Sequence, residues 1–248
     1  METNDIIFAD ESPQMLDAYT KAQRTFKYFW REAWWERRRI VPALDLVCVK
    51  TKFHQEQSSG SPIVEHMWFN DIDFDGIHVR GILLNQPNQL TNIKQGDSVD
   101  IPLGEITDWL FTIDEKAYGG FTIQVLRKAM DKNELEEHDK AWGLDFGDPD
   151  NIQVVFEQDE HPENLIEHPM SKVMGPSLKD FLSKHPEELT KKDDSGYTML
   201  HWETIAGNKT CVEILLEMGA DVAARTNSGY TASDFAKKME WEHLIPIL

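Results

Sequence analysis

Cysteine and long apolar runs are both scarce in this chain of 248 residues. Only two cysteines occur, Cys48 and Cys211, and each lies in an apolar pattern, so we expect no disulfide framework and a reducing, cytoplasmic location. No apolar run reaches the roughly 18 residues that a membrane helix needs. The acidic start METNDIIFADES lacks a basic lead followed by an apolar core. We therefore expect neither a membrane span nor a secretory signal.

Motifs for nucleophilic catalysis or nucleotide binding are also missing. The chain has no G-x-S-x-G, no G-x-x-x-x-G-K-[ST] and no G-x-G-x-x-G, and neither cysteine has a histidine beside it in sequence. These absences make catalysis less expected, but residues that meet only in space still allow an enzyme. We expect no cofactor.

Two patterns suggest metal binding at first sight. Asp71-x-Asp73-x-Asp75-Gly76 resembles the first half of a calcium loop, but Ile82 stands where a bidentate carboxylate is required, and a hairpin turn is favoured. The histidines lack zinc spacing: they lie on separate strand patterns or, like His161 and His168, seven residues apart. We expect no metal site and interpret the histidines as structural or solvated.

Positive charge is in short supply. The chain has 25 basic and 44 acidic residues, for a net charge of −19. Residues 131–170 alone carry 13 acids and 2 bases, a net −11. Such a field repels nucleic acid and anionic lipid, so we expect neither as a partner. The segment is either a solvated acidic connector or a surface that attracts a basic protein.

The first 130 residues predict an α+β domain. Ser12-Pro13 begins a long helix with Leu16, Tyr19, Phe26 and Ala33 on its apolar stripe and Arg37–Arg39 at its end. After Pro42 the apolar period changes to two. The predicted strands are LDLVCVKTKF, IVEHMWF, IHVRGILL, DSVDIP and DWLFTI. Asp75-Gly76 predicts a hairpin. GGFTIQVLRKAMDKNELEEHDKAW predicts one helix, so we expect a meandering antiparallel sheet with flanking helices.

Three of these segments resemble a bacterial domain of unknown function typified by the YegJ-like proteins. They are VEHMWFNDI, IKQGDSVDIPLGEITDWLF and YGGFTIQVLR, and the resemblance covers most of residues 15–130. This resemblance implies almost nothing about a catalytic activity or a ligand. By analogy only, related small domains and ankyrin modules occur among immunity proteins that neutralise bacterial toxins.

Residues 171–248 predict a short helical stack, because Gly196-Tyr197-Thr198 recurs 33 residues later at Gly229-Tyr230-Thr231. Each threonine is a predicted helix N-cap. The motif resembles the ankyrin repeat. The matching residues are Gly196, Thr198, Leu200, His201, Gly207, Val212, Leu215, Leu216, Gly219, Ala220 and Asp221. Met199, Glu203 and Ser233-Asp234 depart from that pattern.

About three repeats are expected, the terminal ones degenerate. SLKDFLSKHPEELTKKDDSG predicts the first, with Ser177 as N-cap and Leu178, Phe181 and Leu182 on one face. The resemblance implies an all-α ankyrin stack that binds protein, and a structural hydrogen-bonding role for His201 beside the threonine cap.

Our first functional hypothesis is a cytoplasmic, non-enzymatic protein-binding module, of the immunity type, with a basic partner. The exposed contact candidates are Tyr197, Met199, Trp202, Asn227 and Tyr230. The alternative is a metal-dependent or hydrolytic enzyme. Its candidate pocket is Glu65, His66, Trp68, Asp108 and Trp109. A third interpretation is that the repeats only stabilise the first domain.

Overall fold

The computed structural model describes residues 12–58 and 60–248, which form two compact units. Among the described residues, the sheet unit consists of residues 12–29 and Arg39–Phe156, and the helical unit consists of Trp30–Arg38 and Glu157–Leu248. The first helix, α2 (Pro13–Glu36), contributes residues to both units.

Helix α2 begins as predicted. The Ser12 hydroxyl accepts a hydrogen bond from the Met15 amide at 3.1 Å, and Pro13 occupies the first turn. In the sheet unit its buried stripe is Met15, Ala18, Ala22, Phe26 and Phe29. The predicted stripe was wrong at its start, because Leu16 is exposed. The helix stops at Glu36, so Arg37–Arg39 follow the helix and do not form its last turn.

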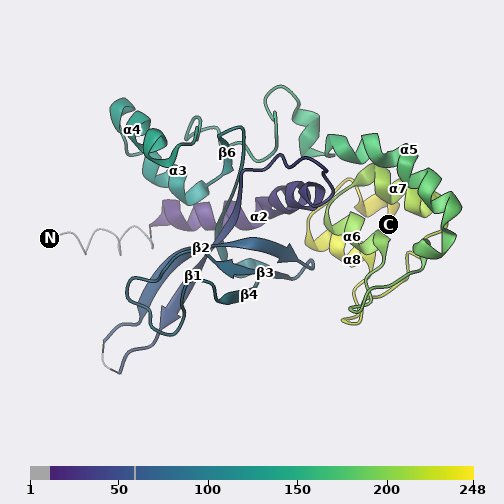
Figure 1. Cartoon of the computed structure of the whole chain (residues 1–248), viewed down its shortest axis with the longest axis horizontal. Helices are drawn as coiled ribbons and strands as arrows, with labels where there is room; N and C mark the ends of the chain where they lie inside the picture. Colours follow the sequence, from purple (N-terminus) through teal and green to yellow (C-terminus); the bar gives the residue numbers. More distant parts are fainter. Residues whose placement is uncertain (1–11, 59) are drawn as a thin grey trace. The chain divides into compact units, whose positions relative to one another are not determined.

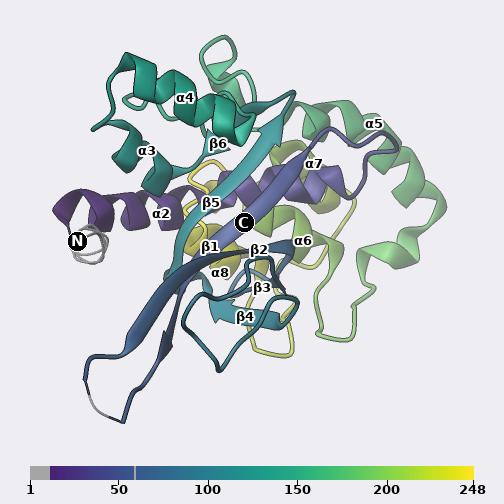
Figure 2. The same ribbon diagram turned by 60° about the vertical axis from the view of Figure 1, so that its left-hand side comes forward.

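The sheet is antiparallel and six-stranded, with the order β4-β3-β2-β1-β5-β6 (Figure 1). Its strands are β1 (Leu46–Gln55), β2 (Ile63–Phe74), β3 (His78–Leu83), β4 (Ser98–Pro102), β5 (Ile106–Ile113) and β6 (Lys116–Gly119). The predicted meander holds from β1 to β4. Strand β5 then returns to the other side of β1, which therefore lies between β2 and β5 (Figure 2). Strand β6, a short strand that ends at a glycine pair, was not among the strands predicted from the sequence.

Helix α2 packs on one face of the sheet through aromatic side chains. Phe26 meets Phe74 edge to face at 5.1 Å, and Phe29 lies 5.7 Å from the ring of Trp109. The Trp109 indole donates to the backbone carbonyl of Ala22 at 3.0 Å, so its polar atom is satisfied inside the core. Leu110, which alternates with Trp109 along β5, packs in a second cluster with Cys48, Ile123 and Phe146. The contacts of the buried Trp109 with Ala22 and Phe29 therefore fix the position of α2 on the sheet.

The single helix predicted after Gly119-Gly120 is two helices, α3 (Phe121–Arg127) and α4 (Lys132–Trp142), which lie near β6 (Figures 1 and 2). Asp131 causes the break. Its carboxylate accepts from the amides of Asn133 and Glu134 at 2.8 and 3.0 Å, and the Glu134 side chain accepts from the Asp131 amide at 2.7 Å. This capping box starts a new helix.

The helical unit contains the predicted helix pairs. Its helices are α5 (Pro169–Lys184), α6 (Met199–Ile205), α7 (Lys209–Glu217) and α8 (Ala232–Lys238), with short 3₁₀ turns at η2 (Pro162–Leu165), η3 (Pro186–Leu189) and η4 (Ile245–Ile247). A further 3₁₀ turn, η1 (Leu103–Glu105), belongs to the sheet unit. Helix α5 packs on α7, and α6 packs on both α7 and α8. Thr198 and Thr231 form capping boxes at the starts of α6 and α8, which confirms both predicted N-caps.

The predicted start of the first repeat was wrong. Ser177 lies inside α5, which begins at Pro169 and continues through Pro176. Its N-cap is His168, whose Nδ1 accepts from the Met170 amide at 3.1 Å. Leu182 is buried as expected, but Phe181 is 41% exposed. Pro176 lies inside α5 although proline normally disfavours a helix interior, so no local pattern shows that the helix begins before Ser177.

None of the helices within residues 12–248 combines the length and apolar composition that a bilayer crossing requires.

The glycine at the end of β6 offers a test of sheet packing. Gly119 and Gly143 both have positive φ, at 80° and 66°, but a Cβ on Gly119 would overlap the carbonyl oxygen and ring of Trp109, whereas a Cβ on Gly143 meets nothing within 4 Å. We expect Gly143→Ala to lower the free energy of unfolding by about 1 kcal/mol, from backbone strain alone. Gly119→Ala should cost roughly 3 kcal/mol or more. Urea denaturation measures both, and equal costs would contradict this account.

Candidate partner-binding site

A groove with a cavity volume of about 300 Å³ lies in the helical unit. Its aromatic lining comes from Trp34, near the end of α2, and from Tyr197 and Trp202 at the start of the second repeat. Met199 and Thr198 also line it. Its charged lining residues are Arg38, Glu188, Lys191, Lys192 and Asp193. Three of the five predicted contact residues, Tyr197, Met199 and Trp202, are thus brought together.

The aromatic rings of the groove form one row. Trp34 stacks on Trp202 with centroids 5.7 Å apart and an interplanar angle of 20°. Trp202 stacks on Tyr197 at 4.5 Å and 20°, and Tyr197 on Phe235 at 5.6 Å and 26°. The Arg38 guanidinium lies over Trp34, 4.5 Å from the ring centroid. Flat aromatic faces with an adjacent guanidinium suit the binding of a side chain.

The individual contact candidates differ in exposure. Trp202 and Met199 are half-buried, but Tyr197 is only 6% exposed, so its expected place on an exposed turn tip is corrected. Asn227 is exposed and its amide donates to the carbonyl of Asp194 at 3.0 Å, which ties the two glycine turns together. Tyr230 is half-buried, with its ring 5.4 Å from Phe235. Asn227 and Tyr230 do not line the groove.

A buried polar network holds the last residues of the α2 segment in the helical unit. Glu203, which is 2% exposed, accepts from Arg38 at 2.5 Å and from the Asn208 amide at 2.7 Å. The Asn208 carbonyl oxygen accepts from the Trp35 indole at 2.9 Å. Glu203 departs from the ankyrin pattern, and its partner Arg38 lies 165 residues earlier in the chain. The departure is visible in the sequence, but no local pattern identifies Arg38 as the partner of Glu203.

Further contacts of the same segment reach η2 and the start of α5. The buried Arg31 donates to the backbone carbonyls of Asn164 and Ile166. His168, interpreted from sequence as structural or solvated, is buried, and its Nε2 lies 3.0 Å from the Glu32 carboxylate. Because the same ring caps α5 through Nδ1, the histidine is structural.

His201 also has a structural role. Its Nδ1 accepts from the Thr198 amide at 3.0 Å, and its Nε2 donates to the carbonyl of Ala224 at 3.1 Å. Both ring nitrogens are engaged, as the resemblance implied. Burial lowers the pKa of His201, and the hydrogen bond to Ala224 only partly opposes this. The neutral ring is therefore the form that the fold holds.

The pocket expected in the sheet unit divides among separate structural roles. The Glu65 carboxylate accepts from the amides of Asn88, Gln89 and Leu90 at 2.9, 2.5 and 3.0 Å. Although partial burial acts to raise it, these three hydrogen bonds lower the pKa of Glu65. Glu65 therefore anchors the loop that follows β3.

Asp108 caps a helix inside the sheet unit. It is fully buried and accepts from the amides of Phe121 and Thr122 at 2.9 and 2.8 Å and from the Thr122 hydroxyl at 2.5 Å. Burial raises the pKa of Asp108, and the bonds from Thr122 act against this rise. These donors form the first turn of α3, so the carboxylate satisfies amides that the helix leaves unpaired.

Of the remaining pocket candidates, Trp68 shares a neighbour with Asp108, because Lys50 of β1 pairs with both residues in the sheet. Trp109 is in the core, and Trp68 carries the Lys50 ammonium 5.4 Å from its ring centroid. His66 lies 3.2 Å from the Thr107 hydroxyl and stacks on Tyr19 at 5.7 Å. The five residues are thus used to build the sheet unit, and none of them lines the groove of the helical unit.

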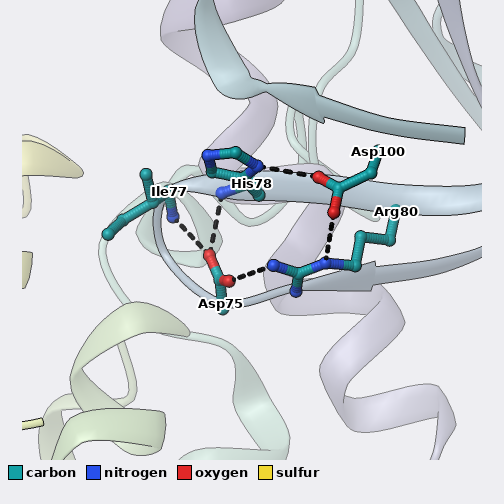
Figure 3. A network of polar contacts seen from close by, with 5 residues as sticks. All are labelled: Asp75, Ile77, His78, Arg80 and Asp100. Atoms are coloured by element: carbon teal, nitrogen blue, oxygen red, sulfur yellow. Dashed lines mark hydrogen bonds and ion pairs between the residues drawn. The ribbon is translucent and has the colours of Figure 1, made fainter. Parts of the chain in front are cut away.

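The aspartate-rich stretch at the β2–β3 hairpin forms an ion-pair network (Figure 3). Asp75 accepts from the amides of Ile77 and His78 at 2.9 and 2.8 Å and pairs with Arg80 at 2.7 Å. Asp100 of β4 pairs with Arg80 at 3.0 Å and with His78 at 2.7 Å. The predicted hairpin is confirmed, and Asp75 is part of its turn. In residues 12–58 and 60–248, no cluster of three or more His, Cys, Asp or Glu side chains is arranged as a metal site.

The cysteines are poor nucleophiles. Both are free and buried. Burial raises the pKa of Cys48, and the nearby Asp108 carboxylate adds to the rise. Burial likewise raises the pKa of Cys211 to about 12. A thiol that stays protonated at neutral pH cannot attack a carbonyl efficiently.

A second groove, with a cavity volume of about 170 Å³, lies in the sheet unit between α2 and α3. Its lining includes Ala18, Lys21, Phe121 and Lys128. No local pattern in the sequence indicates this groove, because the residues of α2 and α3 that line it are about 100 positions apart.

Fold and site together define the class: an antiparallel α+β domain joined to ankyrin repeats with an aromatic groove. The family model described as "Uncharacterized protein conserved in bacteria (DUF2314)" matches residues 12–146, more than half of the chain. The chain belongs to this family.

Relatives cover both parts of the chain. The "Putative ankyrin repeat protein NMB1133/NMB1171" of Neisseria meningitidis serogroup B (strain ATCC BAA-335 / MC58) is 49% identical over 240 residues, 97% of this chain and 94% of that protein. The "Uncharacterized protein YegJ" of Escherichia coli (strain K12) is 34% identical over 73 residues, 29% of this chain and 48% of that protein. "Ankyrin repeat and SAM domain-containing protein 6" of Mus musculus is 30% identical over 109 residues, 41% and 12% respectively. No solved structure matches. Both predicted resemblances are confirmed.

The Glu203 network predicts a selective loss of stability. Glu203→Ala removes the buried acceptor of both Arg38 and Asn208, and we expect a loss of about 2 kcal/mol in the free energy of unfolding. The matched control is Glu213→Ala on α7, which removes a half-exposed pair with Lys209 at 3.7 Å. That control should change the free energy by less than about 0.5 kcal/mol. Urea denaturation compares them, and similar losses would show that the buried network is unimportant.

His201 predicts a pH dependence. Its pKa is lowered on folding, so the unfolded chain binds a proton that the folded chain refuses. The contribution to stability is fully present above the unfolded-state value of about 6.5 and is lost as the pH falls below it. His201→Gln keeps a residue that suits the capping box but cannot titrate. We expect this variant to lose less stability than the wild type between pH 7 and pH 5 in thermal unfolding.

The control for this experiment is His185→Gln, which changes an exposed histidine that follows α5. Its pH profile should match that of the wild type. If His201→Gln retains the wild-type slope, the neutral ring is not the source of the dependence.

Proposed function

We propose that this protein binds another protein through its helical unit and that the groove beside Trp202 is the contact surface. The observation that carries the proposal is the row of stacked rings in the groove, with Trp34 and Trp202 half-buried. Tryptophan, tyrosine and arginine supply most of the energy of protein interfaces, and here all three residue types line one hollow. Rings already held by stacking lose little conformational freedom on binding.

The family context supports binding in general. Ankyrin repeats in the Neisseria relative accompany the same sheet domain over almost the whole length of both chains. The engaged carboxylates of Glu65 and Asp108 lend no support to an enzyme, because their acceptor positions serve backbone amides.

We further propose a cytoplasmic role as an immunity-type protein that neutralises a bacterial toxin domain. The support is the family resemblance and the free cysteines, which suit a reducing compartment. The net charge of −11 over residues 131–170 favours a basic partner, whose approach it would accelerate electrostatically.

Affinity capture from the native host tests the binding function. We expect the wild type and Phe181→Ala to retain the same partner and Trp202→Ala to bind it roughly 30-fold more weakly, as for a residue at the centre of an interface. Phe181 is the control, because this aromatic residue of α5 is 41% exposed, does not line the groove and lies outside residues 131–170. Quantitative binding to the purified partner gives the ratio. A partner held equally by all three proteins would move the contact surface away from the groove.

The immunity role is tested separately with the captured partner. Expression of that partner alone should arrest growth, and co-expression of this chain should restore it. Harmless expression of the partner would refute the immunity role while leaving protein binding intact.

A further inference from the structure

We propose that the groove beside Trp202 receives an acidic peptide segment that carries one apolar or aromatic anchor residue. The inference rests on the proposed protein-binding function and specifies the chemistry of the segment that enters the groove. The segment proposed for the groove is acidic, whereas the acidic stretch 131–170 favours a basic surface of the partner.

Acceptor groups of the groove are already engaged. Both oxygens of Asp193 are used: one accepts from the amides of Ser195 and Tyr197, each at 2.9 Å, and the other from the Trp202 indole at 3.2 Å. The Glu188 carboxylate pairs with Lys191 at 2.8 Å. A basic ligand would therefore share these carboxylates with the donors that already bind them.

Donor groups of the groove are in excess. Lys192 donates to the neutral backbone carbonyl of Arg225 at 2.9 Å, so this bond leaves its charge uncompensated. Lys191 is 66% exposed and its pair with Glu188 is a surface pair, which contributes little and exchanges easily. Each ammonium carries three donors. Both lysines can thus donate to a carboxylate of a ligand while they keep their present contacts.

The local charge differs from that of the whole chain. The lining residues include three cations, Arg38, Lys191 and Lys192, and two carboxylates, Glu188 and Asp193. Arg38 is paired with the buried Glu203, so with that partner counted the groove is close to neutral in a chain of net −19, and the two lysines are the cations left for a ligand. A carboxylate near them is attracted, whereas a basic side chain meets like charges.

The aromatic rings of the groove indicate the apolar anchor residue of the ligand. Trp34 and Trp202 are half-buried and leave part of their apolar surface exposed. A volume of about 300 Å³ is at the lower end of ligand pockets, so it suits one anchor side chain and not a whole helix. An apolar residue beside a carboxylate uses both the rings and the lysines.

A displayed library of random 12-residue peptides tests the inference with the full-length protein. The library is first depleted on Trp202→Ala, which removes peptides that bind elsewhere, including basic peptides held by the acidic surface. It is then selected on the wild type. We expect the enriched peptides to have net negative charge and an aromatic or large aliphatic residue. Circular dichroism confirms that each variant is folded, and Trp202→Phe replaces Trp202→Ala if the latter is not.

Charge reversal then locates the acidic contact. Binding of an enriched, labelled peptide to Lys191→Glu should be about tenfold weaker than to the wild type. Lys238→Glu makes the same charge change at an exposed lysine at the end of α8, outside the groove lining, and should change affinity less than about twofold. Lys191→Gln removes the positive charge without adding a negative charge beside Glu188 and should give an intermediate loss.

Two results would overturn the inference in different ways. Enriched peptides that are neutral or basic, yet depend on Trp202, refute the acidic ligand and leave protein binding through the groove intact. No enrichment, or binding insensitive to both Trp202→Ala and Lys191→Glu, refutes peptide binding at the groove and with it the proposed contact surface.

Discussion

The Glu203 carboxylate is the constraint on which the helical unit depends. A buried carboxylate is tolerated only when charged or polar donors surround it, and Glu203 has Arg38 on one oxygen and Asn208 on the other. Asn208 in turn orients the Trp35 indole. The network requires residues 30–38 in place, and these same residues carry Trp34 into the groove. The proposed contact surface thus depends on the contacts that hold the end of α2 against the second repeat.

Several carboxylates elsewhere in the chain act as acceptors for backbone amides. Glu65 anchors a loop, Asp108 caps α3, Asp131 caps α4 and Asp193 closes the turn before α6. These four acidic residues therefore serve local structure, where an unpaired buried amide would otherwise be costly. The negative surplus that remains sets the long-range field of the protein, while the groove has its own, donor-rich character.

Aromatic side chains divide between the two units according to their surroundings. In the sheet unit, Trp109 is buried and hydrogen-bonded to the backbone of α2, so it contributes packing alone. In the helical unit, Trp34 and Trp202 are stacked but only half-buried, so part of their apolar surface remains for a ligand. The same residue type therefore builds the core of one unit and the proposed contact surface of the other.

Local signals in the sequence determined the elements whose physics is local: the start of α2 at Ser12-Pro13, the Asp75-Gly76 hairpin and the threonine caps at Thr198 and Thr231. The repeat of 33 residues likewise predicted the class of the helical unit. Met199 and Trp202, predicted as contacts from turn position and residue type, both line the groove. Tertiary structure alone decided the return of β5 to β1, the buried position of Tyr197 and the pairing of Arg38 with Glu203. Those features depend on side chains far apart in the chain, which leave no periodic or short-range pattern in the sequence.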